Sequence, residues 1–188
     1  MRFTRRELKD LVISWGVLSF AFAVVWWGID RPFLLLKMLP MTIVTVGTAF
    51  ILHEMAHKYV AQWYGFPAEF RKWDLGLFLA LGSSFLGFLF AAPGAVHIYG
   101  IGEPRAAMKI SIAGPLTNLG VALGAIGLSV LFKDIENFLF FLAYLNLFIA
   151  MFNLLPIPPL DGSKVLRYSP IIWGAVFFPI LALIYIVI

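Results

Sequence analysis

Long apolar blocks dominate this chain of 188 residues. Several of them approach the ~20 residues that a helix needs to cross a lipid bilayer. In order, the blocks cover residues 11–29, 41–64, 75–92, 110–132, 138–155 and 171–188. Hydrophobic residues make up 62% of the chain and charged residues 13%, whereas soluble domains hold roughly half and a quarter. We therefore expect an all-α polytopic membrane protein in a lipid bilayer, with about five to six transmembrane helices.

Short connections separate the blocks, and none is long enough to hold a second folded domain. The sequence thus predicts one integral membrane domain over residues 1–188, with its core at about 41–168. The net charge of +4 is modest and forms no basic stripe, which argues against a nucleic-acid partner. Without cysteine there is no disulfide framework, no thiol nucleophile and no thiolate metal ligand. Any metal must therefore bind nitrogen or oxygen.

The first block has features of a signal peptide, because basic residues within positions 2–9 precede its apolar run. The run continues through Trp26 and Trp27, however, and is longer than the usual core of a signal peptide. Tryptophan is also typical of the membrane–water interface. We therefore expect an uncleaved transmembrane helix.

The third block, residues 75–92, differs from the others because Gly82-Ser83-Ser84 interrupts its middle. Two short apolar arms around this tripeptide would suit a hairpin that enters the membrane and returns, provided that protein or water satisfies its backbone. A transmembrane helix that contains glycine is the alternative. The local sequence favours neither.

An H-E-x-x-H motif, His53-Glu54-Met55-Ala56-His57, lies within the second block. A spacing of four residues places both imidazoles on one face of a helix, where they can bind the same ion. Glu54 projects beside that face and can take a proton from a water molecule at the metal. The motif also arises by chance on solvated helices. Inside a membrane segment, however, a charged side chain costs about 2.5–3.5 kcal/mol to insert, which favours a function.

A catalytic zinc site needs a third protein ligand besides two histidines. Asp161 is the favoured candidate because it follows the run Pro156-Ile157-Pro158-Pro159, which must be extended or kinked. Such backbone is tolerated at membrane depth where it lines a cavity. Gly162 then gives the freedom to point the preceding carboxylate inward. The other candidates are His97, for which we favour a strand end at the interface, and Glu69, Asp74 and Glu103.

These motifs resemble those of the site-2 protease family, which pairs H-E-x-x-H on a transmembrane helix with a distant N-x-x-P-x-P-x-x-D-G. Both occur here in that order, the second over residues 153–162. The segment Ala113-Gly114-Pro115-Leu116-Thr117-Asn118 resembles a further family element, A-G-P-x-x-N. The likeness spans about residues 47–162 and includes no PDZ or CBS regulatory module.

The resemblance implies a zinc metalloendopeptidase that holds one Zn2+ ion. Its substrates would be membrane proteins, cleaved in or near a transmembrane segment, as in regulated intramembrane proteolysis. It also implies a re-entrant β-like hairpin between the H-E-x-x-H helix and the following helix. The implied zinc ligands are His53, His57 and Asp161, and the implied catalytic base is Glu54. The implied substrate contacts are Asn153, Pro156 and Pro158.

The sidedness of the ligands restricts the topology. His57 and Asp161 can bind one ion only from the same side of the membrane. Three blocks lie between them, and three full crossings would place Asp161 on the opposite side. Block 75–92 should therefore not span the membrane. Cytoplasmic loops carry an excess of Lys and Arg. With a cytoplasmic N-terminus, a re-entrant block leaves ten basic loop residues inside and three outside, against seven and six if it spans. We expect five spanning helices in the cell membrane, a C-terminus outside, and an active site toward the cytoplasm.

Other functions could use the same ligands. A membrane zinc transporter or sensor would need no catalytic base, although the lack of a visible inverted repeat counts against it. A non-haem iron oxygenase would use two histidines and one carboxylate as a facial triad, but the second carboxylate of Glu54 favours hydrolysis. A catalytically idle relative is a third alternative, against which the intact set of four residues argues.

Three asparagines, Asn118, Asn146 and Asn153, lie in or at the end of apolar blocks. We expect them to form hydrogen bonds between helices, which is the commonest use of amides in a membrane. Only Asn153 has the support of a motif for a role in substrate binding.

Overall fold

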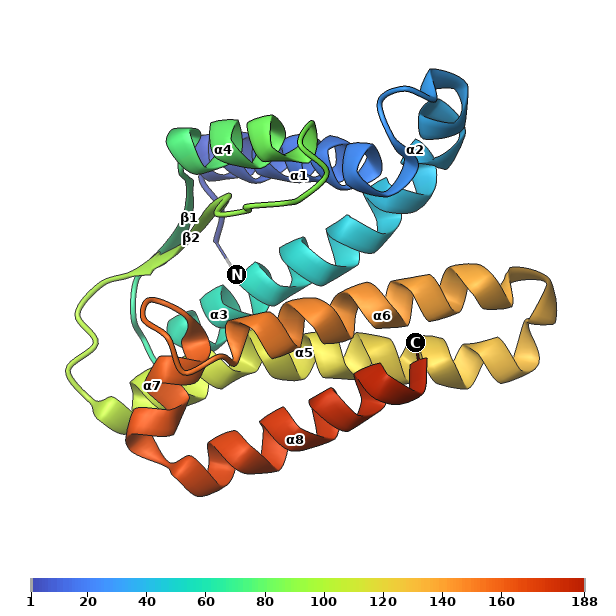
Figure 1. The fold of residues 1–188 in the computed structure, drawn as a ribbon. Coiled ribbons are helices and arrows are strands. Elements are labelled where there is room, and N and C mark those ends of the chain that lie inside the picture. Colours follow the sequence, from blue (N-terminus) through green and yellow to red (C-terminus); the bar gives the residue numbers. More distant parts are fainter. Residues whose placement is uncertain (1, 188) are drawn as a thin grey trace.

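The computed structural model describes residues 2–187, most of which are helical (Figure 1). The α-helices are α1 (Arg5–Trp27), α2 (Pro32–Val46), α3 (Leu52–Trp63), α4 (Asp74–Ser84), α5 (Pro104–Leu131), α6 (Glu136–Asn153), α7 (Asp161–Tyr168) and α8 (Pro170–Val187). The other elements are a π-helical turn η1 (Gly47–Ile51), a 3-10 turn η2 (Lys133–Ile135) and the strands β1 (Ala68–Lys72) and β2 (Gly94–Ile98). The predicted helical class is confirmed, with one small sheet as its β component.

Four helical runs within residues 2–187 are long and apolar enough to cross a bilayer. These runs are α1, the continuous stretch from α2 to α3, α5, and η2 together with α6. Helices α4 and α8 are apolar but shorter. The four runs support the predicted membrane protein, and the number of crossings beyond them stays a prediction.

The second spanning run is continuous from Pro32 to Trp63 and includes α2, η1 and α3. The predicted start at residue 41 is too late, because Pro32 takes the first helical turn, where a missing N–H is tolerated. Pro40 lies inside the run at an exposed position. The wider π-helical turn η1 ends immediately before α3, whose second residue is His53, and such turns are frequent at functional sites.

The third block does not turn at Gly82-Ser83-Ser84, so the predicted hairpin tip is wrong. Helix α4 runs through this tripeptide. Each serine hydroxyl donates to the carbonyl three residues earlier, at 3.2 and 2.7 Å, and so stays within the helix. The chain reverses only after α4, where Gly87 has a φ of +83°. The block is therefore a short helix with an irregular return segment, and its re-entry into a bilayer stays a prediction.

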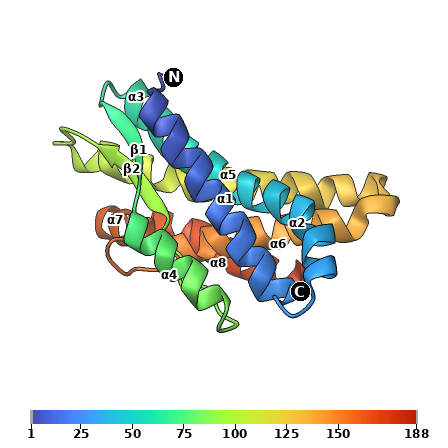
Figure 2. The ribbon, with the colours of Figure 1, turned by 90° about the horizontal axis from the view of Figure 1, so that it is seen from above.

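The sheet is formed by β1 and β2, which pair antiparallel with Phe70 opposite Val96. It lies beside α1 and α3, as Figure 2 shows. The Trp73 N–H donates to the Pro93 carbonyl at 3.1 Å, so the two ends of the segment around α4 meet. The expected β structure after the H-E-x-x-H helix is thus present, but its strands lie outside the predicted residues 75–92.

Two clusters of buried apolar side chains hold the helices together. One joins α5, α6 and α8 and includes Leu147 and Ile180. The other joins α1, α2, η1, β1, α4 and α6. At its centre the rings of Phe50 and Phe70 meet edge to face, with centroids 5.6 Å apart. This second cluster positions the sheet against the start of α3.

Candidate metal centre

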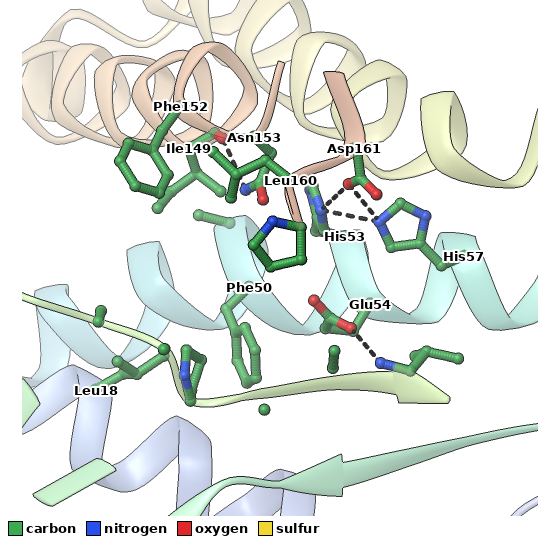
Figure 3. A pocket seen from close by; sticks show the side chains of 18 of the residues that line it. Leu18, Phe50, His53, Glu54, His57, Ile149, Phe152, Asn153, Leu160 and Asp161 are labelled. Atoms are coloured by element: carbon green, nitrogen blue, oxygen red, sulfur yellow. Dashed lines mark hydrogen bonds and ion pairs between the residues drawn. The ribbon is translucent and has the colours of Figure 1, made fainter. Parts of the chain in front are cut away.

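Three side chains converge at the junction of α3 and α7 (Figure 3). His53 and His57 lie one turn apart on α3, and their Nε2 atoms are 3.0 Å apart. Asp161, the first residue of α7, places Oδ2 3.0 Å from Nε2 of His57 and 3.4 Å from Nε2 of His53. All three residues are at most 9% exposed. The structure therefore brings together the three predicted ligands from segments far apart in the sequence.

The donor set fits a zinc ion. Zinc binds histidine nitrogen and carboxylate oxygen at about 2.0–2.2 Å, so adjacent ligand atoms of a tetrahedral site lie about 3.3 Å apart. The three separations here, 3.0, 3.0 and 3.4 Å, are close to that value. Two imidazoles and one carboxylate are also a typical donor set of catalytic zinc sites, which keep a fourth position open.

The outer ring nitrogens of both histidines have acceptors. Nδ1 of His53 lies 2.5 Å from the amide oxygen of Asn118, and Nδ1 of His57 lies 2.7 Å from the carbonyl oxygen of Ile110. Both partners are oxygens that can only accept, so each Nδ1 carries the proton. In the neutral ring, each Nε2 then has a lone pair for a metal.

Asn118 is itself held by further hydrogen bonds. Its NH2 group donates to the Ala49 carbonyl at 2.8 Å and to the Asn146 side chain at 2.9 Å. Asn146 in turn donates to the hydroxyl of Thr48 at 3.2 Å. The interhelical bonds predicted for Asn118 and Asn146 are confirmed, whereas the contact by which Asn118 orients a histidine was not predicted. The A-G-P-x-x-N segment was the available signal.

Asn153 behaves differently from the other two asparagines. Its NH2 group donates to the carbonyl of Ile149 in the same helix, at 3.0 Å, so the predicted interhelical bond is wrong here. Its side chain lines the cavity beside the metal centre. Pro156 and Pro158 are exposed and are not among the residues that line this cavity, whereas Pro159 and Leu160 are.

Gly114 of α5 lies directly against the two histidines. A Cβ atom at this position would lie 2.5 Å from Nε2 of His57 and 2.6 Å from Nε2 of His53. No side chain can therefore be added here without displacing the donor atoms. This contact explains why the segment 113–118 carries glycine at its second position.

Glu54 lies beside the three donors but is not one of them (Figure 3). Its carboxylate is directed toward β2, where Oε2 accepts a hydrogen bond from the Val96 N–H at 3.0 Å. Glu54 and the three donors line the same cavity, and the volume of this cavity is about 380 Å3. Much of the cavity wall is apolar and comes from α1, η1, β2 and α6.

Asp161 is positioned by a tight contact of the residue that follows it. Gly162 was expected to supply conformational freedom, but it lies in α7, and a Cβ there would be 2.0 Å from the Leu154 carbonyl oxygen. Close approach is therefore the reason for this glycine. Burial by itself would raise the pKa of the Asp161 carboxyl, but the facing His57 and His53 hold it below its ordinary value. Lys164 adds a cation 3.6 Å from Oδ1.

The other candidate ligands lie elsewhere. His97 is exposed in β2, opposite Glu69 of β1. Glu69 accepts hydrogen bonds from Thr4 and Arg71. The bond from the Thr4 hydroxyl is the main reason why the pKa of the Glu69 carboxyl is lowered. Asp74 and Glu103 lie at the starts of α4 and α5. Among the described residues, only the three side chains at the α3–α7 junction form a group that could hold a metal.

Known proteins resemble this chain over most of its length. A protein of Methanocaldococcus jannaschii, named as a zinc metalloprotease, is 39% identical over an alignment of 186 residues, which covers 96% of this chain and 93% of the relative. One from Bacillus subtilis, also named as a zinc metalloprotease, is 32% identical over 153 residues and 70% of each chain. A second zinc metalloprotease of M. jannaschii is 30% identical over 120 residues, which cover 62% of this chain and 30% of the relative. No solved structure gives a significant match.

A family model agrees with these relatives. Residues 128–174, which include Asp161, match the model described as peptidase family M50. The names of the relatives imply Zn2+ as the metal, and the donors at the α3–α7 junction offer it a site. With two named relatives matched over most of their own length, the chain belongs to peptidase family M50, the site-2 protease family of membrane zinc metalloproteases.

Proposed function

We propose that this metalloprotease hydrolyses peptide bonds in or near the transmembrane segments of membrane-protein substrates, and so acts in regulated intramembrane proteolysis. One observation carries the proposal. Glu54 lines a single cavity together with His53, His57 and Asp161. This cavity lies among α1, α3 and α6, which belong to runs long enough to cross a bilayer. The carboxylate of Glu54 and the three donor side chains thus lie within the helical bundle.

In this proposal His53, His57 and Asp161 hold one Zn2+ ion. When bound, zinc lowers the pKa of water and polarises a carbonyl group. Two neutral imidazoles and one carboxylate cancel only one of its two charges. These three ligands therefore leave one positive charge at the ion, which would attract the carbonyl oxygen of a substrate peptide bond.

Glu54 moves the protons. Because Oε2 accepts the Val96 N–H, Oε1 is the oxygen that receives a proton from the attacking water. The hydroxide oxygen bonds to the carbonyl carbon, and the bond between that carbon and the amide nitrogen breaks. Glu54 then returns the proton to the leaving nitrogen, so that it is regenerated as a carboxylate. The Val96 hydrogen bond keeps the carboxylate oriented through both transfers.

The cavity offers both apolar and polar contacts to a substrate. Leu18, Phe22 and Phe152 contribute apolar walls, and the amide of Asn153 adds a polar group. A transmembrane helix must unwind locally before water can attack its backbone, and the exposed backbone groups then need partners. We infer that Asn153 contacts the unwound substrate directly. Pro156 and Pro158 contribute by shaping the loop before Asp161.

Reconstitution of the purified protein in liposomes tests this function. The reporter carries one transmembrane segment, and mass spectrometry locates the cut. We expect zinc-dependent cleavage in or next to the transmembrane segment, and much slower cleavage of a soluble peptide with the sequence of the reporter's loop. Cuts confined to the soluble part would contradict the proposal. Zinc transport into the liposomes without any cleavage would favour the transporter instead.

A further inference from the structure

An ion pair between Glu7 of α1 and Lys58 of α3 is buried in the interior of the protein. Glu7 is 0% and Lys58 1% exposed. The Lys58 ammonium also lies 4.3 Å from the centre of the Phe3 ring, which covers it. A buried ion pair is a weak source of stability, because removing two charges from water offsets their attraction. The proposed chemistry at Glu54 does not use this pair directly.

Glu7 makes a second contact that reaches the sheet. Its Oε1 accepts the backbone N–H of Phe70 in β1 at 3.0 Å. Phe70 stands directly opposite Val96 of β2, and the Val96 N–H donates to Oε2 of Glu54 at 3.0 Å. In an antiparallel pair of this kind, both N–H groups point away from the partner strand. One pair of facing residues is therefore held between two carboxylates, one on α1 and one on α3.

These contacts form a closed ring that starts and ends on α3. Glu54 and Lys58 are four residues apart and lie on the same face of the helix. From Lys58 the ring passes through Glu7, Phe70 and Val96 and returns to Glu54. The position of the sheet relative to α3 is thus fixed at two points on one helical face.

We propose that Glu7 is a positioning residue for the catalytic base. It binds Lys58 and the Phe70 N–H at once, and so holds β2 where the Val96 N–H orients the Glu54 carboxylate. This inference rests on the proposed role of Glu54. When Glu7 no longer accepts the Phe70 N–H, the sheet loses a polar contact opposite the Val96–Glu54 hydrogen bond, and the Glu54 carboxylate is oriented less firmly.

Two double variants separate this role from a general effect on folding. Glu7→Gln/Lys58→Met and Glu7→Leu/Lys58→Met both remove the two buried charges, so neither leaves an unpaired ion. Glutamine keeps an oxygen that accepts the Phe70 N–H, whereas leucine does not. We expect the Leu/Met variant to have a kcat about 30- to 100-fold below that of the Gln/Met variant, with unchanged KM and one zinc per chain. The exposed pair Lys133→Met/Glu136→Gln is the control and keeps the wild-type kcat.

Hydrogen exchange of single amides gives a readout that is independent of catalysis. We expect the Phe70 and Val96 amides to exchange at least about tenfold faster in the Leu/Met variant than in the Gln/Met variant, with α5 and α6 unchanged. Faster exchange throughout the protein would assign Glu7 a merely structural role and overturn the inference. Equal kcat and equal exchange in the two variants would also overturn it.

Wild-type protein offers a test that needs no variant to fold. Neither the Phe70 nor the Val96 amide donates to the partner strand, yet both are expected to be protected from exchange. Exchange of either at the rate of an exposed amide would overturn the ring of contacts. None of these results bears on whether Glu54 is the base, because that role fails only if Glu54→Gln still cleaves the substrate.

Discussion

The amide oxygen of Asn118 lies 2.5 Å from Nδ1 of His53 and joins α5 to the histidine-bearing helix α3. The amide cannot turn over without losing its bonds to Ala49 and Asn146, whose oxygens accept from its NH2 group. His53 is consequently held with Nε2 toward His57. The metal centre is therefore oriented from α5 as well as built on α3 and α7.

Asn118→Ala is expected to weaken zinc binding by about 10- to 100-fold, because the imidazole of His53 loses the partner that fixes its orientation. Competition with a chelator of known affinity measures the change. Ser129→Ala on the same helix is the control, since this hydroxyl donates only to a carbonyl of its own helix. Wild-type zinc affinity in Asn118→Ala would contradict the orienting role.

Gly114→Ala should abolish stoichiometric zinc binding while helical content stays unchanged. The added methyl group would enter the space between the two Nε2 atoms. Gly124→Ala is the matched control, because a Cβ there meets nothing within 4 Å. This control is expected to bind zinc normally and to gain about 0.5–1 kcal/mol of stability. Metal analysis measures the zinc content of both variants, and circular dichroism measures their helical content. A zinc-loaded Gly114→Ala would refute the close contact of Gly114 with the donor atoms.

Asp161→Asn should keep the fold but lose zinc far more readily than the wild type, because a neutral amide replaces the anionic ligand. A chelator is expected to abolish hydrolysis by the wild type, and added zinc to restore it. The same zinc concentration should fail to restore the variant. Asp74→Asn, at an exposed carboxylate paired with Lys72, is the control and should respond like the wild type. Full recovery of Asp161→Asn would remove Asp161 from the ligand set.

The absence of cysteine makes the proposed orientation easy to test in intact cells. Arg105 and Asp134 are exposed near the two ends of α5. A membrane-impermeant maleimide is expected to label Asp134→Cys from outside, and Arg105→Cys only after the cells are permeabilised. The reverse pattern would place the metal centre on the outer side of the membrane.

Local features of the metal centre could be predicted from the sequence, because a spacing of four residues fixes the relation of His53 and His57 within one helix. A second motif predicts Asp161 as a ligand, and in the structure Asp161 lies beside both histidines. The predicted reason for the neighbouring Gly162, conformational freedom, is wrong. Its close contact with the Leu154 carbonyl arises from tertiary packing, which the local sequence does not specify.

Other features depend on contacts between distant segments. The serines that suggested a hairpin tip bond within α4 instead, so the local signal of glycine and serine misplaced the turn. The A-G-P-x-x-N segment indicates a role for Asn118 but not its partner, and the buried Glu7–Lys58 pair has no local signal at all, because the partners lie on other helices. In an apolar chain, the polar side chains form the specific contacts, and these become visible only once the helices are packed.

The most direct test measures zinc content and reporter cleavage together for the wild type and Glu54→Gln. Glutamine has nearly the same shape but cannot accept the proton from water, and Glu54 lies outside the three-residue donor group. We predict one zinc per chain in both proteins and no detectable cleavage by Glu54→Gln. Cleavage at the wild-type rate by a zinc-loaded Glu54→Gln would contradict the account.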